Sequence, residues 1–104
     1  MKSEMLFEVS TPLGFNVRCT VPYWTFIISQ KHPSLAGKEQ EIERVLSDPD
    51  AVRLSRKDPD VFLFYREATN RLLCVVVKRE AGAAFLITAY RTDTIKAGEE
   101  IWTK

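Results

Sequence analysis

The sequence contains few of the residues from which metal sites, disulfide frameworks and cofactor-binding loops are built. Its 104 residues include two cysteines, one histidine and four glycines. It has no CxxC pair and no glycine-rich phosphate loop, so we expect neither a metal nor a cofactor. The cysteines, Cys19 and Cys74, each lie in an apolar strand-like run. We therefore expect two buried, reduced thiols rather than a disulfide.

The chain also lacks an excess of charge and a long apolar run. Fifteen basic and fourteen acidic residues leave a net charge of +1, so a site for a polyanion would have to be a local basic patch. No run is long enough to span a bilayer, and the first four residues lack the apolar region of a signal peptide. These absences predict a cytoplasmic protein with no membrane contact. Its length and its 45% apolar content predict one domain, residues 1–104.

The first third of the chain predicts a β-hairpin followed by a helix. Residues 4–9 alternate loosely and residues 15–21 strictly, and Thr11-Pro12-Leu13-Gly14 between them is typical of a turn. In residues 22–31, Trp24, Ile27 and Ile28 have helical spacing. Trp24, Phe26 and Ile28 also alternate, so a strand stays open as the alternative. A proline after His32 favours a break at that residue.

A second helix is predicted over residues 35–47. Apolar residues at positions 35, 42, 45 and 46 share one helical face, and charged residues lie largely outside it. Gly37 weakens the first turn, so the regular part is expected to start near Lys38. Asp48-Pro49 should end the helix.

The second half of the chain predicts strands joined by short turns. The expected strands cover residues 51–55, 61–66, 71–78 and 84–91, and the turns cover residues 68–70 and 80–82. Successive strands with short turns form an antiparallel meander. The predicted fold class is α+β: an N-terminal β-hairpin and two helices packed on a small twisted antiparallel sheet, a meander of three to four strands.

Strand periodicity predicts which side chains share a face of this sheet. In the last strand, Leu86, Thr88 and Tyr90 alternate with the residues of the opposite face. A turn centred near position 81 would place Thr88 opposite Cys74 and Tyr90 opposite Leu72. A slip of one residue would reverse the face, so this register is a hypothesis.

The preceding turn decides whether a cation joins the same face. If it is centred near Ala68, Phe64 and Arg66 lie on the face that carries Thr88 and Tyr90. Arg66, Thr88 and Tyr90 would then gather at one end of the sheet. By contrast, Arg53, Arg56 and Lys57 are interpreted as a solvated loop.

These residue types fit one chemistry, the cleavage of a phosphodiester by a neighbouring ribose 2′-hydroxyl. That reaction needs proton transfer, positive charge and hydrogen-bond donors around the phosphate oxygens. Histidine can exchange a proton near neutral pH, so His32, the only histidine, could act as acid or base, although a lone histidine can equally be structural. Tyr90 could donate to phosphate or stack a base. The catalytic candidates are His32, Thr88 and Tyr90, and the substrate-binding candidates are Lys31, Arg66 and Arg91.

Several short motifs occur in an order that resembles a known superfamily. They run from residue 24 to residue 102 and leave only the first hairpin outside. The motifs are Trp24, His32-Pro33, Asp48-Pro49, Phe64-Tyr65-Arg66, Val75-Val76-Val77-Lys78, Ile87-Thr88-Ala89-Tyr90 and Gly98-Glu99-Glu100-Ile101-Trp102. In this order they look like phage-associated members of the barnase–EndoU–colicin–RelE-like superfamily of metal-independent ribonucleases and toxins.

The resemblance implies N-terminal helices on a small twisted antiparallel sheet, with RNA bound on the exposed face. It implies a site formed by a helix-end histidine and a last-strand hydroxyl, here His32, Thr88 and Tyr90. It also implies a cognate antitoxin or immunity protein as partner. Two other hypotheses stay open: a non-catalytic binding or regulatory domain for nucleic acid or protein, and an interaction module that forms a homodimer through an exposed strand edge.

Overall fold

The computed structural model describes residues 4–68, 70–95 and 98–104, and its chain begins with the predicted hairpin. Strand β1 (Met5–Ser10) pairs antiparallel with strand β2 (Asn16–Thr20). In the turn between them, the Thr11 hydroxyl donates to the Phe15 carbonyl at 2.9 Å. Gly14 has a φ of +89°, a conformation that glycine adopts without the steric cost of a Cβ.

The segment after the hairpin is helical, which settles the open choice between helix and strand. Helix α1 (Val21–Phe26) continues into a π-helical turn, η1 (Ile27–Lys31). The Thr20 side chain accepts a hydrogen bond from the Tyr23 amide and so caps the N-terminus of α1. The chain leaves helical geometry at His32, which has φ −137° and ψ 76°. Pro33 explains this break, because a proline disfavours helical geometry in the residue before it.

The second predicted helix is present and starts as late as its glycine suggested. A short 3₁₀ turn, η2 (Pro33–Leu35), precedes helix α2 (Glu39–Ser47). Gly37 between them has a φ of +79°. All four apolar residues of the predicted face are buried, which confirms that face: Leu35, Ile42, Val45 and Leu46.

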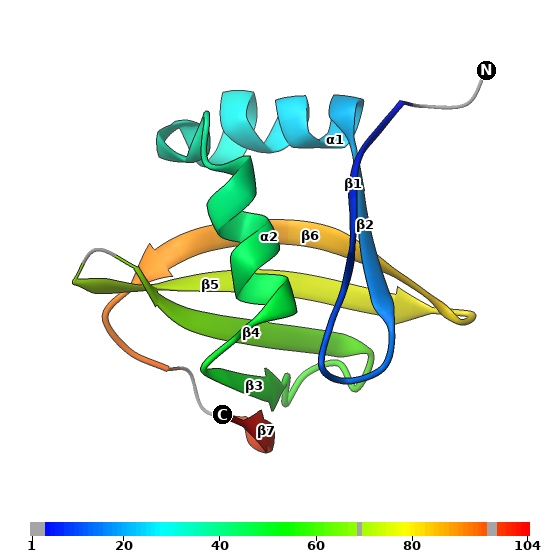
Figure 1. Cartoon of the computed structure of the whole chain (residues 1–104), viewed down its shortest axis with the longest axis vertical. Helices are drawn as coiled ribbons and strands as arrows, with labels where there is room; N and C mark the ends of the chain where they lie inside the picture. Colours follow the sequence, from blue (N-terminus) through cyan, green and yellow to red (C-terminus); the bar gives the residue numbers. More distant parts are fainter. Residues whose placement is uncertain (1–3, 69, 96–97) are drawn as a thin grey trace.

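Within the described residues, five further strands complete a seven-stranded sheet of order β1-β2-β6-β5-β4-β3-β7 (Figure 1). These strands are β3 (Ala51–Leu54), β4 (Val61–Ala68), β5 (Arg71–Glu80), β6 (Ala83–Thr92) and β7 (Glu99–Thr103). The α+β class and the antiparallel meander β3–β6 are confirmed. The strand count of three to four was too low, and the sheet is mixed, because β2 pairs in parallel with β6 and β7 adds to β3.

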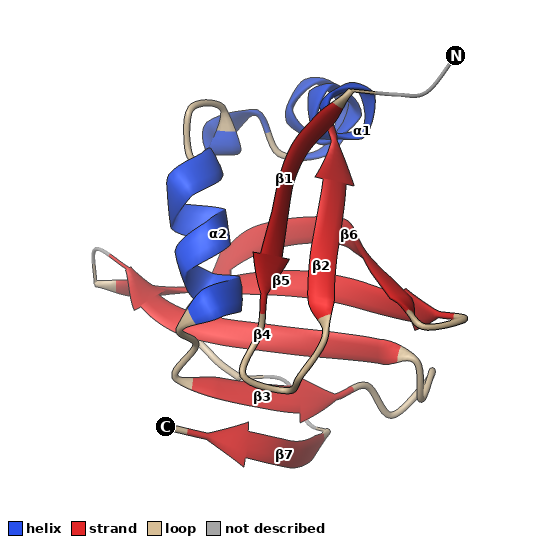
Figure 2. Cartoon of the chain, turned by 45° about the vertical axis from the view of Figure 1, so that its right-hand side comes forward, coloured by secondary structure: helices blue, strands red, loops and turns tan. Residues whose placement is uncertain are grey.

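The two faces of the sheet differ in the elements that pack against them. Helix α2 and the β1–β2 hairpin lie across the same side of β4 and β5 (Figures 1 and 2). The main core fills this side, which we call the helix face. The opposite side, which we call the open face, carries a separate buried cluster of Leu63, Tyr65 and Cys74. Both cysteines are buried, and neither forms a disulfide bond. None of the described helices has the length and apolar character needed to cross a membrane.

The register between β5 and β6 differs by two residues from the predicted register. Tyr90 lies opposite Cys74 instead of Leu72, and Thr88 lies opposite Val76 instead of Cys74. A shift of two residues leaves Thr88 and Tyr90 on the face on which they were predicted. Thr88 and Tyr90 therefore share the open face, as predicted, although with different neighbours.

Two local features produce this shift. The β5–β6 turn consists of Ala81 and Gly82, with φ of +48° and +82°, so it is centred half a residue later than predicted. A bulge opposite the step from Val76 to Val77 then adds one more residue to β6. The bulge also places Leu86 on the helix face, where it is 2% exposed. The prediction that Leu86 shares a face with Thr88 was wrong for this reason.

The register between β4 and β5 overturns a second prediction. The last pair before the turn is Ala68 with Arg71, so each residue of β4 pairs an odd number of positions further along β5 than predicted. An odd displacement moves each side chain of β4 to the face opposite the predicted one. Thr69, part of the predicted turn, lies outside the described residues. Phe64 and Arg66 consequently pair with residues of the main core and belong to the helix face. Neither lies with Thr88 and Tyr90.

Candidate functional site

A cleft of about 480 Å³ lies on the open face where β4, β5 and β6 meet the loop after β3. It has an apolar floor from the strands and a polar rim from the loop and from β6. Its lining residues are Ser55, Arg56, Lys57, Val61, Leu63, Val76, Thr88 and Tyr90. Two of the three predicted catalytic candidates, Thr88 and Tyr90, thus line one cavity.

The Thr88 hydroxyl is a buried polar group in the wall of the cleft. Its Oγ1 atom is shielded from solvent and has no hydrogen-bond partner among the residues that the structure describes. Buried polar atoms are nearly always paired, so an orphaned hydroxyl in a cleft wall needs an explanation. A ligand oxygen bound in the cleft would supply the missing partner.

Tyr90 stays protonated at all ordinary pH values. Burial raises the pKa of its phenol far above the usual range, and hydrogen bonds with Cys74 and Tyr65 raise the pKa further. The phenol oxygen is shielded from solvent, and its one proton is engaged by these two neighbours. Because the phenol does not ionise near neutral pH, it cannot serve there as a base.

His32 lies beside Tyr90 rather than inside the cleft. Its ring centroid is 6.3 Å from that of Tyr90, and the two ring planes are inclined by 35°. The residue is half-buried, and its ring makes no hydrogen bond with the described residues. The break before Pro33 aims His32 at this point, because η1 ends there and the chain turns. His32, Tyr90 and Thr88 thus form a continuous edge along β6.

Lys31, a predicted substrate-binding residue, is exposed and next to His32 in the chain. Its Nζ atom lies 5.6 Å from the centroid of the Phe26 ring, in a cation–π contact. Phe26 is itself 43% exposed. Lys31 therefore places its charge over the end of α1 and not at the cleft.

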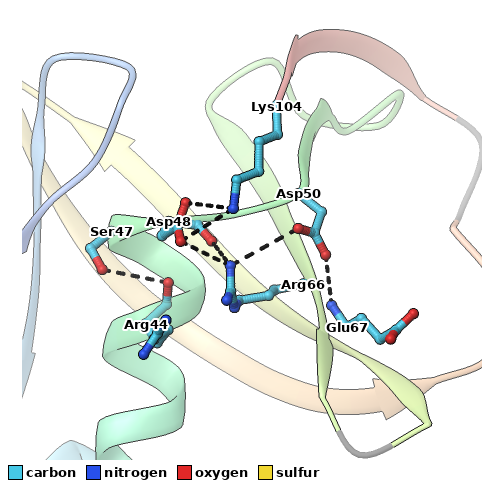
Figure 3. Close-up of polar contacts among 7 residues, drawn as sticks. All are labelled: Arg44, Ser47, Asp48, Asp50, Arg66, Glu67 and Lys104. Atoms are coloured by element: carbon cyan, nitrogen blue, oxygen red, sulfur yellow. Dashed lines mark hydrogen bonds and ion pairs between the residues drawn. The ribbon is translucent and has the colours of Figure 1, made fainter.

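Arg66 lies on the helix face and does not line the cleft with Thr88 and Tyr90. Its Nη1 atom donates to the Asp48 backbone carbonyl at 2.6 Å and to Asp48 Oδ2 at 3.1 Å (Figure 3). Asp50 lies 4.0 Å from the same nitrogen, and Lys104 Nζ lies 3.1 Å from Asp48 Oδ1. This cluster, Asp48–Asp50–Arg66–Lys104, ties the end of α2 to β4 and to the last residue.

Arg91 also belongs to the helix face. It lies directly opposite Leu73, a residue of the main core, and its Nη2 atom is 3.7 Å from Glu41 Oε2 on α2. Its neighbours Thr92 and Tyr90 alternate with it across the sheet. The structure therefore does not bring either predicted arginine to the cleft.

The cations of the cleft are Arg56 and Lys57, from the predicted solvated loop. Arg53, predicted to belong to the same loop, lies instead in strand β3 and donates to the Gly98 carbonyl at 3.1 Å. Arg56 and Lys57 are both exposed. Their loop is anchored where the Ser55 amide donates to the Val61 carbonyl at 2.9 Å and the Lys57 amide donates to Ser55 Oγ at 3.2 Å. The signal in the sequence that could have pointed to Arg56 and Lys57 is a pair of adjacent cations directly after a predicted strand. Their proximity to Thr88 depends on long-range strand order, which local pattern does not give.

Comparison with known proteins finds no family model, no curated protein and no solved structure that matches this chain. Among the described residues, no group of three or more His, Cys, Asp or Glu side chains is placed to hold a metal ion. The arrangement of the cleft itself is therefore the basis for a proposal about function.

The Asp48 cluster predicts a pH dependence of stability. The hydrogen bond from Lys104, with Arg66 nearby, lowers the pKa of Asp48 below its ordinary value. A lowered pKa stabilises the fold above the unfolded value of about 3.9, and this stabilisation is lost as pH falls through the folded value. Asp48→Asn should therefore lower the melting temperature at pH 7, and the difference from the wild type should shrink as pH falls below about 4.

Asp93→Asn is the matched control, because Asp93 pairs with Arg71 at the surface and its side chain is 76% exposed. Exposed pairs of this kind contribute little, so its melting temperature should stay close to the wild type. Thermal unfolding followed by circular dichroism from pH 3 to pH 7 makes the comparison. An Asp48→Asn protein as stable as the wild type at pH 7 would contradict the role given to the cluster.

Proposed function

We propose that this domain is a metal-independent endoribonuclease of toxin type that cleaves RNA by attack of a 2′-hydroxyl, with His32 as acid or base. The observation that carries the proposal is the shared edge of His32, Tyr90 and Thr88 on the open face, beside the cations of the cleft. The order of motifs that resembles the barnase–EndoU–colicin–RelE-like superfamily supports the same function.

The proposed reaction requires one proton transfer at the 2′-oxygen and another at the 5′-oxygen. The 2′-hydroxyl loses its proton, its oxygen attacks phosphorus, and the bond from phosphorus to the 5′-oxygen breaks as that oxygen gains a proton. The products are a 2′,3′-cyclic phosphate and a 5′-hydroxyl. His32 serves as the base at the 2′-oxygen or the acid at the 5′-oxygen, and water serves at the other.

The remaining residues stabilise charge or bind the substrate. The Thr88 hydroxyl donates to a non-bridging phosphate oxygen, where negative charge grows in the transition state, and the Tyr90 ring provides a surface on which a base stacks. Arg56 and Lys57 on the rim of the cleft attract the phosphate backbone. A cognate antitoxin or immunity protein would have to cover this face to block the reaction.

A non-catalytic RNA-binding domain is the second candidate. Arg66 and Arg91 are engaged on the helix face, so the described part of the cleft has only two cations, Arg56 and Lys57, on its rim. Binding requires positive charge and surfaces on which bases stack, and it does not require proton transfer. The two candidates therefore differ in what the loss of His32 should do.

The proposed function predicts that His32 is required for cleavage and not for folding. His32→Ala should lower the rate of RNA cleavage by roughly 10²–10⁴-fold. His32→Gln should lower it similarly, because glutamine keeps one hydrogen bond but cannot exchange a proton near neutral pH. Incubation with total RNA in the presence of EDTA, with products resolved on a gel, measures the rate.

The pH–rate profile separates the two roles of His32. A base is active when deprotonated, so its rate falls on the acid side, and an acid gives a rate that falls on the alkaline side. The inflection should be absent from His32→Gln. A folded His32→Gln protein that cleaves at the wild-type rate would end the proton-transfer role, and a wild-type protein that binds RNA without cleaving it would favour the second candidate.

Arg56 and Lys57 should contribute to the binding of RNA more than to the rate of its cleavage. Arg56→Gln and Lys57→Gln should each raise KM for RNA with a smaller effect on kcat, and each should reduce the dependence of binding on salt concentration. Arg71→Gln is the control, since it removes one exposed cation from the far end of β5. Equal changes in all three variants would show that only net charge matters and would contradict a rim that contacts the backbone.

A further inference from the structure

Three polar side chains form a row across the middle of the open face. Tyr65 on β4 lies directly opposite Cys74 on β5, and Cys74 lies directly opposite Tyr90 on β6. Directly opposed residues on neighbouring strands point to the same face, with Cβ atoms about 5 Å apart. Tyr65 and Cys74 are 0% exposed, and Tyr90 forms the wall of the cleft.

The position of the row is unusual for polar atoms. Its surroundings are apolar, with Leu63, Val61, Leu72 and Val76 packed around it. A phenylalanine in place of Tyr65 would fill the same space without the cost of removing a hydroxyl from water, which is repaid only if the hydroxyl is paired. The hydrogen bonds of Tyr90 with Tyr65 and Cys74 provide that pairing. The row is thus a buried polar network that ends at the site.

We infer that Tyr65 and Cys74 are positioning residues that fix the ring and hydroxyl of Tyr90 at the wall of the cleft. The inference rests on the proposed function only for its effect on RNA cleavage. Neither residue reaches the cleft, so each acts through Tyr90. Their hydrogen bonds hold the phenol protonated, and the rigid strands β4 and β5 set its place relative to His32 and Thr88.

Titration of the tyrosines tests the inference without RNA. The chain has three tyrosines, so the Cζ signals of ¹³C-labelled tyrosine can be assigned by substitution. In the wild type, the Tyr90 signal should not shift up to the highest pH at which the protein stays folded. In Tyr65→Phe and in Cys74→Ala it should begin to shift at a lower pH. Cys74→Ser, which keeps a hydrogen-bonding group, should restore most of the wild-type behaviour.

Tyr23→Phe is the matched control. The Tyr23 hydroxyl donates to the Ile87 carbonyl at 2.7 Å, so this variant also loses one tyrosine hydrogen bond, but outside the row. The Tyr90 titration should be the same in Tyr23→Phe as in the wild type. If Tyr65→Phe and both Cys74 variants leave that titration unchanged, the positioning role is wrong, whatever they do to stability.

RNA cleavage provides the second measurement. Tyr65→Phe should lower kcat about three- to tenfold, the scale of one hydrogen bond, with KM nearly unchanged, because the contacts with the substrate stay in place. An unchanged kcat together with a shifted Tyr90 titration would overturn the role in catalysis. If the wild type cleaves no RNA, the proposed function fails, and the titration alone still decides whether the row controls Tyr90.

Discussion

Strand β5 is the element on which the rest of this structure depends. It lies in the middle of the meander and pairs with β4 along one edge and with β6 along the other. Its residues are buried alternately on two faces, so Leu73, Val75 and Val77 enter the main core while Cys74 lies in the open-face cluster. Side chains along a strand alternate between the two faces of the sheet. Whether β4 and β6 are displaced along β5 by an even or an odd number of residues therefore decides which of their side chains lie on the open face.

This constraint explains why the cleft has the residues it has. An even displacement between β5 and β6, from the Ala81-Gly82 turn and the bulge, keeps Thr88 and Tyr90 on the open face. An odd displacement between β4 and β5 sends Arg66 to the helix face, where it holds the end of α2 through Asp48. The charge that faces the cleft then comes from a loop rather than from a strand. The scaffold and the site therefore use different cations.

Local pattern was sufficient for most of the elements and insufficient for their pairing. Helical spacing of Ile42, Val45 and Leu46 gives α2, and alternation gives β4, β5 and β6, because burial of one face leaves a periodic trace in the sequence. The bulge in β6 leaves no such trace. Strand β7 begins with two glutamates and owes its pairing to β3, more than forty residues earlier, so only the assembled sheet reveals it. For the same reason local pattern does not show that Arg56 and Lys57 flank the cleft, or that His32 approaches Tyr90.

The central claim is that the open face, along the edge from His32 to Thr88, is where RNA binds. The most direct measurement is backbone amide chemical-shift mapping by NMR, with a single-stranded oligonucleotide whose 2′-hydroxyls are methylated so that it cannot be cleaved. The account predicts the largest shifts at His32, Thr88, Tyr90 and the loop at Arg56 and Lys57, and small shifts on α2. Shifts centred on α2 and around Arg66 and Arg91, or none at all at millimolar RNA, would contradict it.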